Sequence, residues 1–148
     1  MKKAIVLVGS LAAFVCIGYV VQSLYFVYFQ NQSLDQEQYE QLITVDETKK
    51  VDGQYITVKQ IGINETEAAV RYTTSSWNPL QALYDVEFTI RLDSGKLLYS
   101  EKGRRVNNRF IRKAIDYYQI EEPTENINKV DLAYRQYDRE AYYHISLK

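Results

Sequence analysis

Cysteine, histidine and proline are scarce in this chain. Its 148 residues include one cysteine, one histidine and two prolines. Cys16 lies inside an apolar N-terminal run, so disulfides cannot stabilise the remainder, which must depend on a hydrophobic core. The sequence also lacks a cysteine and histidine cluster at zinc-binding spacing and a glycine-rich phosphate loop. We therefore predict that the protein uses no metal and no other cofactor.

The same scarcity argues against an enzyme. A cysteine–histidine pair cannot form, because Cys16 lies in the apolar run. A Ser-His-Asp triad would have to use His144, which the alternation places on the polar face of a terminal strand beside Tyr142 and Ser146. The ordinary interpretation there is a solvent-facing histidine. No pair among the 19 acidic residues is singled out for glycosidase chemistry, so we predict a non-enzymatic protein.

Charge is absent from the N-terminal part of the chain. Residues 4–34 carry no formal charge, and about 20 apolar residues suffice to cross a bilayer. Lys2 and Lys3 precede this run and aromatic residues gather at its far end, as expected for a membrane helix with its N-terminus inside. The pattern predicts a cytoplasmic tip at 1–3 and a transmembrane anchor at 4–29. The expected localisation is the cell membrane, single-pass, with the C-terminal domain outside.

Cleavage of this N-terminal segment is the alternative. The one tolerable small-x-small triplet, Ser10-Leu11-Ala12, follows too short an apolar stretch for a good signal-peptidase site. A lipoprotein signal needs a small residue directly before the acylated cysteine, and Val15 occupies that place before Cys16. A retained anchor therefore fits better, and cleavage stays open.

A polar, glutamine-rich stalk at 30–41 precedes a predicted β-rich domain at 42–148. The clearest strand is 84–92, where apolar and polar residues alternate with period two. The turn sequence DSGK with Gly95 follows, and 97–100 is expected to return as the hairpin partner. Further antiparallel pairs are expected at 54–61 with 67–73 and at 130–134 with 141–147.

The segment 107–119 has a different period. Its apolar residues recur with the spacing of one helix face, namely Phe110, Ile111, Ala114, Ile115 and Tyr118. We predict a helix of about three turns that packs on the sheet through this stripe. The fold class expected beyond the anchor is therefore mainly antiparallel β, either an immunoglobulin-like sandwich or a small α+β sheet with one helix near 107–119.

The alternating segments resemble a known kind of exported domain. The matching stretches are ITVKQIGINETEAAVRYTT (56–74), VEFTIRLDSGKLL (86–98) and VDLAYRQYDREAYYHISL (130–147). They are similar to immunoglobulin-like domains that follow a single membrane helix in Gram-positive bacteria, and to the outer domains of some membrane anti-sigma factors. The resemblance implies a sandwich fold and an extracytoplasmic location. It implies no regulatory activity, because three residues before the membrane cannot hold a sigma factor.

Basic residues gather in the segment KGRRVNNRFIRK (102–113). They are Lys102, Arg104, Arg105, Arg109, Arg112 and Lys113. Two of the 18 basic residues precede the apolar run, so the rest of the chain has 16 against 19 acidic ones, a net charge of −3. A basic cluster in such a domain can bind phosphates, or it can be the solvated face of a helix. Nucleic acid is disfavoured because the cluster lacks interleaved stacking aromatics.

Trp77 stands in the predicted loop SSWNPLQALY and is the other candidate contact residue. A loop tryptophan can anchor a partner, or it can fold back to cover the core. We predict a non-enzymatic, membrane-anchored binding or accessory module, with another envelope protein as its partner. The alternative is a binder of an anionic wall polymer or of lipid headgroups through the 102–113 cluster.

Overall fold

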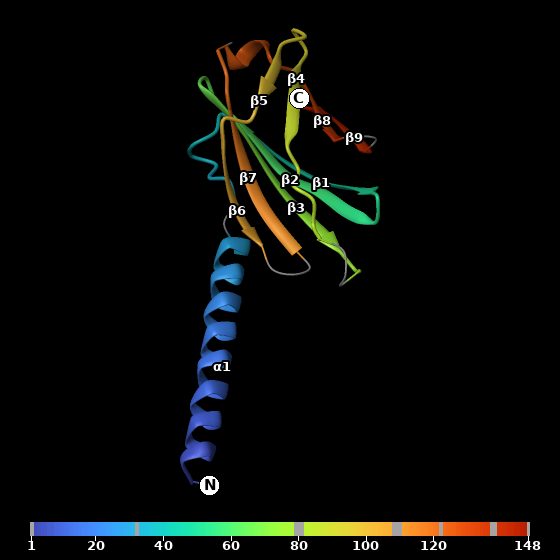
Figure 1. Cartoon of the computed structure of the whole chain (residues 1–148). Helices are drawn as coiled ribbons and strands as arrows, with labels where there is room; N and C mark the ends of the chain where they lie inside the picture. The colour runs from blue at the N-terminus through green and yellow to red at the C-terminus, as the bar shows by residue number, and fades with distance from the viewer. Residues whose placement is uncertain are drawn as a thin grey trace. The chain divides into compact units, whose positions relative to one another are not determined.

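The structure is a computed structural model that describes residues 2–31, 33–78, 82–107, 111–121, 123–136 and 139–147. The chain divides into two units, Met1–Gln32 and Ser33–Lys148. The first unit consists of the helix α1 (Lys2–Asn31), and the second carries the sheets (Figure 1).

Helix α1 does not support the predicted membrane anchor. Among the residues that the structure describes, no helix is both long enough and apolar enough to cross a membrane. A crossing needs about 20 consecutive apolar residues. This finding overturns the transmembrane helix predicted at 4–29 and the single-pass membrane localisation derived from it.

The described part of Ser33–Lys148 contains nine strands and a short 3-10 helix, η1 (Thr124–Asn126). The strands are β1 (Gln41–Val51), β2 (Gln54–Ile63), β3 (Glu67–Ser76), β4 (Phe88–Leu92), β5 (Leu97–Tyr99), β6 (Lys102–Asn107), β7 (Ile111–Gln119), β8 (Lys129–Gln136) and β9 (Arg139–Ser146). They form a five-stranded sheet A, in the order β1-β2-β3-β7-β6, and a four-stranded sheet B, in the order β5-β4-β8-β9. All pairings are antiparallel. The prediction of a β-rich fold is confirmed.

One hydrophobic core lies between the two sheets (Figure 1). Three aromatic rings span it, one from sheet A and two from sheet B. The Tyr72 and Phe88 centroids lie 5.1 Å apart and those of Phe88 and Tyr143 5.8 Å apart, both edge to face. The Tyr143 hydroxyl donates to Ile56 O at 2.8 Å, which satisfies a polar group that would be costly to bury alone. Alternation with one apolar face per strand therefore produces a two-layer fold.

The predicted turn at Gly95 is found, but the strand before it is shorter than expected. Gly95 has a φ of 87°, which glycine adopts at little cost, and the Leu92 amide donates to Lys96 O across this hairpin. β4 begins at Phe88, so the first part of the predicted strand 84–92 belongs instead to a crossing segment, residues 82–87, that leads from sheet A to sheet B.

The predicted helix at 107–119 is wrong, because residues 111–119 form strand β7; residues 108–110 lie outside the described part. β7 lies between β3 and β6 in sheet A. Both of its faces are covered, so Lys113 to Asp116 are buried in succession. A strand covered on both faces loses its period-two signal. Adjacent apolar residues in this strand therefore have the spacing that is expected of one face of a helix.

Candidate functional site

Strand pairing separates the predicted basic cluster into two groups. Successive residues of a strand point to opposite faces of the sheet. Ala114 belongs to the core, so Arg112 on β7 and the cross-strand neighbour Arg105 on β6 lie on the inner side of sheet A. The remaining described members lie on the outer face; they are Lys102, Arg104 and Lys113. Arg109 lies outside the described residues.

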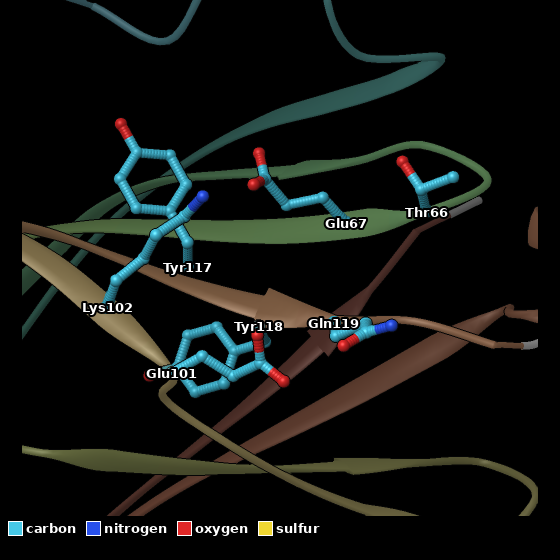
Figure 2. A pocket seen from close by; sticks show the side chains of 7 residues that line it. All are labelled: Thr66, Glu67, Glu101, Lys102, Tyr117, Tyr118 and Gln119. Carbon is cyan, nitrogen blue, oxygen red and sulfur yellow. The ribbon is translucent and has the colours of Figure 1, made fainter.

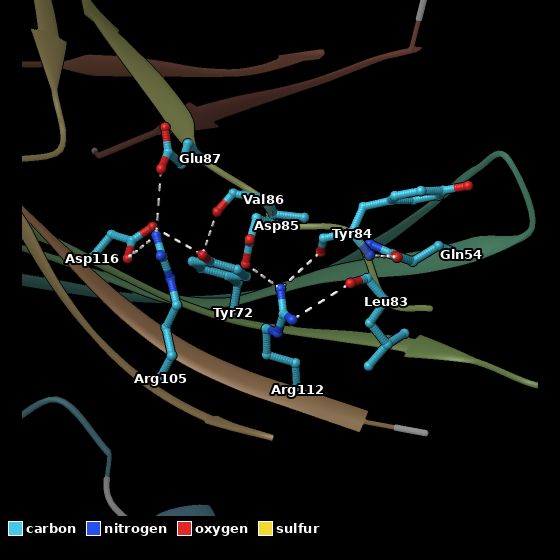
Figure 3. Close-up of polar contacts among 10 residues, drawn as sticks. All are labelled: Gln54, Tyr72, Leu83, Tyr84, Asp85, Val86, Glu87, Arg105, Arg112 and Asp116. Carbon is cyan, nitrogen blue, oxygen red and sulfur yellow. Dashed lines mark hydrogen bonds and ion pairs between the residues drawn. The ribbon is translucent and has the colours of Figure 1, made fainter. Parts of the chain in front are cut away.

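Arg112 holds the crossing segment rather than facing a ligand. Its guanidinium donates to Tyr84 O at 3.0 Å and to Leu83 O at 3.4 Å, and it pairs with the Asp85 carboxylate (Figure 3). The Arg112 side chain is only 14% exposed. The Arg112 guanidinium donates to the backbone of the segment that joins the two sheets, so the role of Arg112 is structural.

Arg105 is the counter-ion of a buried carboxylate. Its Nη2 lies 3.6 Å from Asp116 Oδ1 and 3.9 Å from Glu87 Oε1 (Figure 3). Asp116 is fully buried. Burial raises the pKa of this carboxyl group, while the hydrogen bond from Tyr72 and the charge of Arg105 oppose that rise. Arg105, whose side chain is 36% exposed, therefore pairs with an interior carboxyl group on the inner side of sheet A and does not belong to an outer anion site.

The Tyr72 hydroxyl joins this buried group to the crossing segment. It lies 2.6 Å from Val86 O and 2.9 Å from Asp116 Oδ2. A hydroxyl has one hydrogen, so the Tyr72 hydroxyl donates it either to Val86 O or to the Asp116 carboxylate. This chain of polar groups locks β3, β7 and the crossing segment together.

The outer face of sheet A brings Arg71 beside the remaining cations. In the cross-strand row Gln60–Arg71–Ile115–Arg104, the two arginines flank Ile115. Their backbones are two strand spacings apart, about 10 Å. Lys113 lies two residues from Ile115 on the same face of β7. We call Arg71, Arg104 and Lys113 the outer cationic cluster.

Burial and two nearby cations make it costly for Lys113 to carry its charge. Lys113 is only 9% exposed. Burial, together with the charges of Arg71 and Lys59, lowers the pKa of its ammonium group to about 8. Burial also lowers the pKa of Arg71, and Asp46 opposes this. An anion at this place would relieve the mutual repulsion.

Neighbouring groups orient the cluster. Arg71 Nη1 donates to Gln60 Oε1 at 3.0 Å. The same oxygen accepts from the Leu34 amide at 3.2 Å. Leu34 belongs to a strap, residues 33–40, that lies on the outer face of β2 and buries Leu34 and Tyr39. The strap and the guanidinium of Arg71 are thus connected through one amide side chain.

Lys102 lies at the margin of the cluster. It lines a hollow of about 240 Å³ together with Thr66, Glu67, Glu101, Tyr117, Tyr118 and Gln119. Figure 2 shows Lys102, Tyr117 and Glu67 on one side of β7, with Glu101 and Tyr118 on the other and Gln119 at the end of the strand. Because two carboxylates share the hollow with Lys102 and its lining does not converge on one point, the hollow is a poor anion site.

Trp77 and His144 are both exposed. Trp77 is 86% exposed, so the interpretation that it covers the core is wrong, and its role as a partner contact stays a prediction. His144 lies on the outer face of β9, as predicted, with Nδ1 2.8 Å from Asp131 Oδ1. Within the described ranges, no group of three or more histidine, cysteine, aspartate or glutamate side chains is placed to hold a metal ion.

Comparisons with known proteins give no indication of function. No family model, no curated protein and no solved structure matches this chain.

Proposed function

We propose that the protein is a non-enzymatic binding module whose outer cationic cluster binds a phosphate-bearing polymer. The observation that carries this proposal is the gathering of Arg71, Arg104 and Lys113 around Ile115 on one sheet face. Guanidinium groups match the geometry of phosphate oxygens and bind them in a bidentate manner. Burial, and after it the charges of Arg71 and Lys59, lowers the pKa of the Lys113 ammonium group, so an anion bound nearby would stabilise its charged form.

A polymer suits the cluster better than a single ion. The three cations come from three strands, β3, β7 and β6, and Lys102 continues the positive charge along the edge strand. A chain of phosphodiesters can contact the exposed Lys102 and Arg104 in succession, while the buried Lys113 acts on it through its charge. The predicted anionic wall polymer has this chemistry.

The experiment compares two charge-matched triple variants of the full-length chain. Binding of fluorescently labelled inorganic polyphosphate is measured by anisotropy over a range of salt concentrations. Replacing the outer cationic cluster (R71Q, R104Q and K113Q) should weaken binding about 30-fold or more and flatten the salt dependence. The control removes three cations from sheet B and its β4–β5 hairpin turn instead, with K96Q, K129Q and R135Q, and should change the affinity less than threefold.

Two outcomes would contradict the proposal. Equal losses in both variants would mean that net charge, and not the cluster, attracts the polymer. Binding only to vesicles that contain anionic lipid, with none to polyphosphate, would mean that the ligand is a headgroup surface.

A second candidate is the docking of another protein at Trp77. The observation that favours it is the exposure of this side chain beside Ile111, Ser75 and Ser76, which line a hollow of about 430 Å³. A photoreactive group at position 77 should crosslink a partner, and I111S should reduce that yield. A yield no higher than from position 55 on the neighbouring strand β2 would remove this candidate.

A further inference from the structure

The outer face of sheet B carries a row with an exposed tyrosine at each end. Cross-strand pairing places Tyr99, Thr89, Ala133 and Tyr142 side by side across all four strands. Tyr99 is 66% and Tyr142 43% exposed. The two residues between them are small, so the row forms a shallow trough with an aromatic ring at each end. We call these four residues the tyrosine row.

The next row offers hydrogen-bonding groups whose charges are paired. It consists of Leu97, Arg91, Asp131 and His144. The Asp131 carboxylate lies 2.8 Å from Arg91 Nη2, 2.8 Å from His144 Nδ1 and 3.2 Å from Lys129 Nζ. The Asp131 side chain is only 12% exposed, so it holds the three surrounding groups in place while they face solvent.

One of the tyrosines is itself fixed by the sheet. The Tyr142 hydroxyl donates to Glu140 Oε2 at 3.0 Å, and Glu140 Oε1 pairs with Arg135 Nε at 3.0 Å. The ring is therefore oriented before any ligand arrives. A rigid aromatic platform lowers the entropic cost of binding.

We infer that the tyrosine row and the paired groups beside it bind a neutral polysaccharide. Tyrosine rings offer flat apolar area against which the C–H face of a sugar ring packs. The charged row supplies donors and acceptors for hydroxyl groups along the same direction. Antiparallel sheet faces serve this purpose in other folds that bind oligosaccharides.

The length of the tyrosine row and the charges beside it on the outer face of sheet B favour an elongated, neutral ligand. Three strand spacings separate the two tyrosines, about 14 Å, so a ligand that touches both is elongated. A hollow of about 400 Å³ lined in part by Arg91, Lys129 and Asp131 adjoins the second row and leaves room for sugar substituents. Arg91, Lys129 and Arg135 all pair with Asp131 or Glu140. These three cations against two carboxylates leave a net charge of +1, a small excess for a polyanion such as single-stranded nucleic acid.

The test measures binding of two neutral β-linked hexasaccharides, cellohexaose and the N-acetylglucosamine hexamer, to the full-length chain by calorimetry. At least one should bind. Tyr99→Ala and Tyr142→Ala should each weaken it about fivefold, and the double variant should show no measurable binding. Tyr99→Phe and Tyr142→Phe keep the rings and should retain affinity within twofold. Tyr55→Ala on sheet A is the matched control and should have no effect.

Three results would overturn the inference. They are failure of both hexasaccharides to bind, unchanged affinity in the double alanine variant, and binding of an oligothymidine that the same alanine variants abolish. Both tyrosines are surface residues, and far-ultraviolet circular dichroism verifies that the variants are folded. The substitutions R71Q, R104Q and K113Q should leave hexasaccharide binding intact, which separates this inference from the proposed function.

Discussion

The outer faces of sheets A and B differ in how their charges are arranged. On sheet A, like charges gather, and burial with the neighbouring cations lowers the pKa of Lys113 to about 8. On sheet B, cations surround a carboxylate. Burial there raises the pKa of Asp131, but the hydrogen bonds from His144, Arg91 and Lys129 outweigh burial and hold that pKa well below its usual range. A count of charges cannot distinguish the two cases, since only strand register decides which charges meet.

The largest expected effect is a loss of stability where the strap covers sheet A, with no change in binding on sheet B. A Cβ atom at Gly62 would lie 2.6 Å from Tyr39 Cγ, so Gly62→Ala should displace the strap. We expect a loss of about 3 kcal/mol in the free energy of unfolding, measured by chemical denaturation. Hexasaccharide affinity on sheet B should not change.

A double-mutant cycle sharpens this prediction. Tyr39→Ala removes the ring that Gly62 accommodates, so Gly62→Ala in that background should cost much less than alone. Wild-type stability for Gly62→Ala in the native background would show that the Tyr39 ring does not pack on Gly62.

The next effect distinguishes the two groups of the basic cluster. Arg112→Ala removes the bonds to the crossing segment and should lower the free energy of unfolding by about 2 kcal/mol, without weakening polyphosphate binding by the folded protein. Arg104→Ala is the matched control, for which we expect stability within about 0.5 kcal/mol of wild type and weaker binding. The opposite result, lower stability for Arg104→Ala and weaker polyphosphate binding for Arg112→Ala, would contradict the structural role of Arg112 and the binding role of Arg104.

The third effect concerns the pH dependence of the outer cationic cluster. Lys113 is protonated below its pKa of about 8 and loses its charge above it. Polyphosphate affinity should therefore be full below pH 8 and fall as the pH rises through that value, by about fivefold. Anisotropy titrations from pH 6 to pH 9.5 test this against Lys113→Gln, which should show a flat profile. A parallel decline in that variant would exclude Lys113 as the titrating group.

The smallest effect concerns Lys59. Its pair with Asp46, at 2.6 Å, is exposed on both sides, so Lys59→Gln should change the free energy of unfolding by less than about 0.5 kcal/mol. The charge of Lys59 contributes to the lowered pKa of Lys113. Its removal should therefore raise that pKa, which NMR titration of the Lys113 side chain can detect. A lower or unchanged pKa would contradict this coupling.

Local patterns predicted the local structure well. The β-rich fold, the turn at Gly95 and the outward position of His144 follow from alternation and turn chemistry. The helix at 107–119 failed because β7 is covered on both faces and so has no period-two signal. The immunoglobulin-like resemblance stays a prediction.

The site depended on pairings that are distant in the sequence. Arg71 joins Arg104 only because β3 and β6 both pair with β7. Arg105 does not belong to the outer cationic cluster, because it pairs with the buried Asp116, eleven positions later in the sequence. Gly103 leaves room for that carboxyl group, which a Cβ atom there would contact too closely. Each of these facts needs the strand register, which the sequence alone did not supply.

The most direct test of the central claim is a pair of NMR titrations on full-length, isotope-labelled protein. Polyphosphate should shift the backbone amide signals of Arg71, Arg104, Lys113 and Ile115 most strongly and leave sheet B unchanged. The bound hexasaccharide should shift the signals of the tyrosine row instead. The largest polyphosphate shifts on β4, β8 or β9, or shifts spread evenly over both sheets, would contradict the assignment of anion binding to the outer cationic cluster.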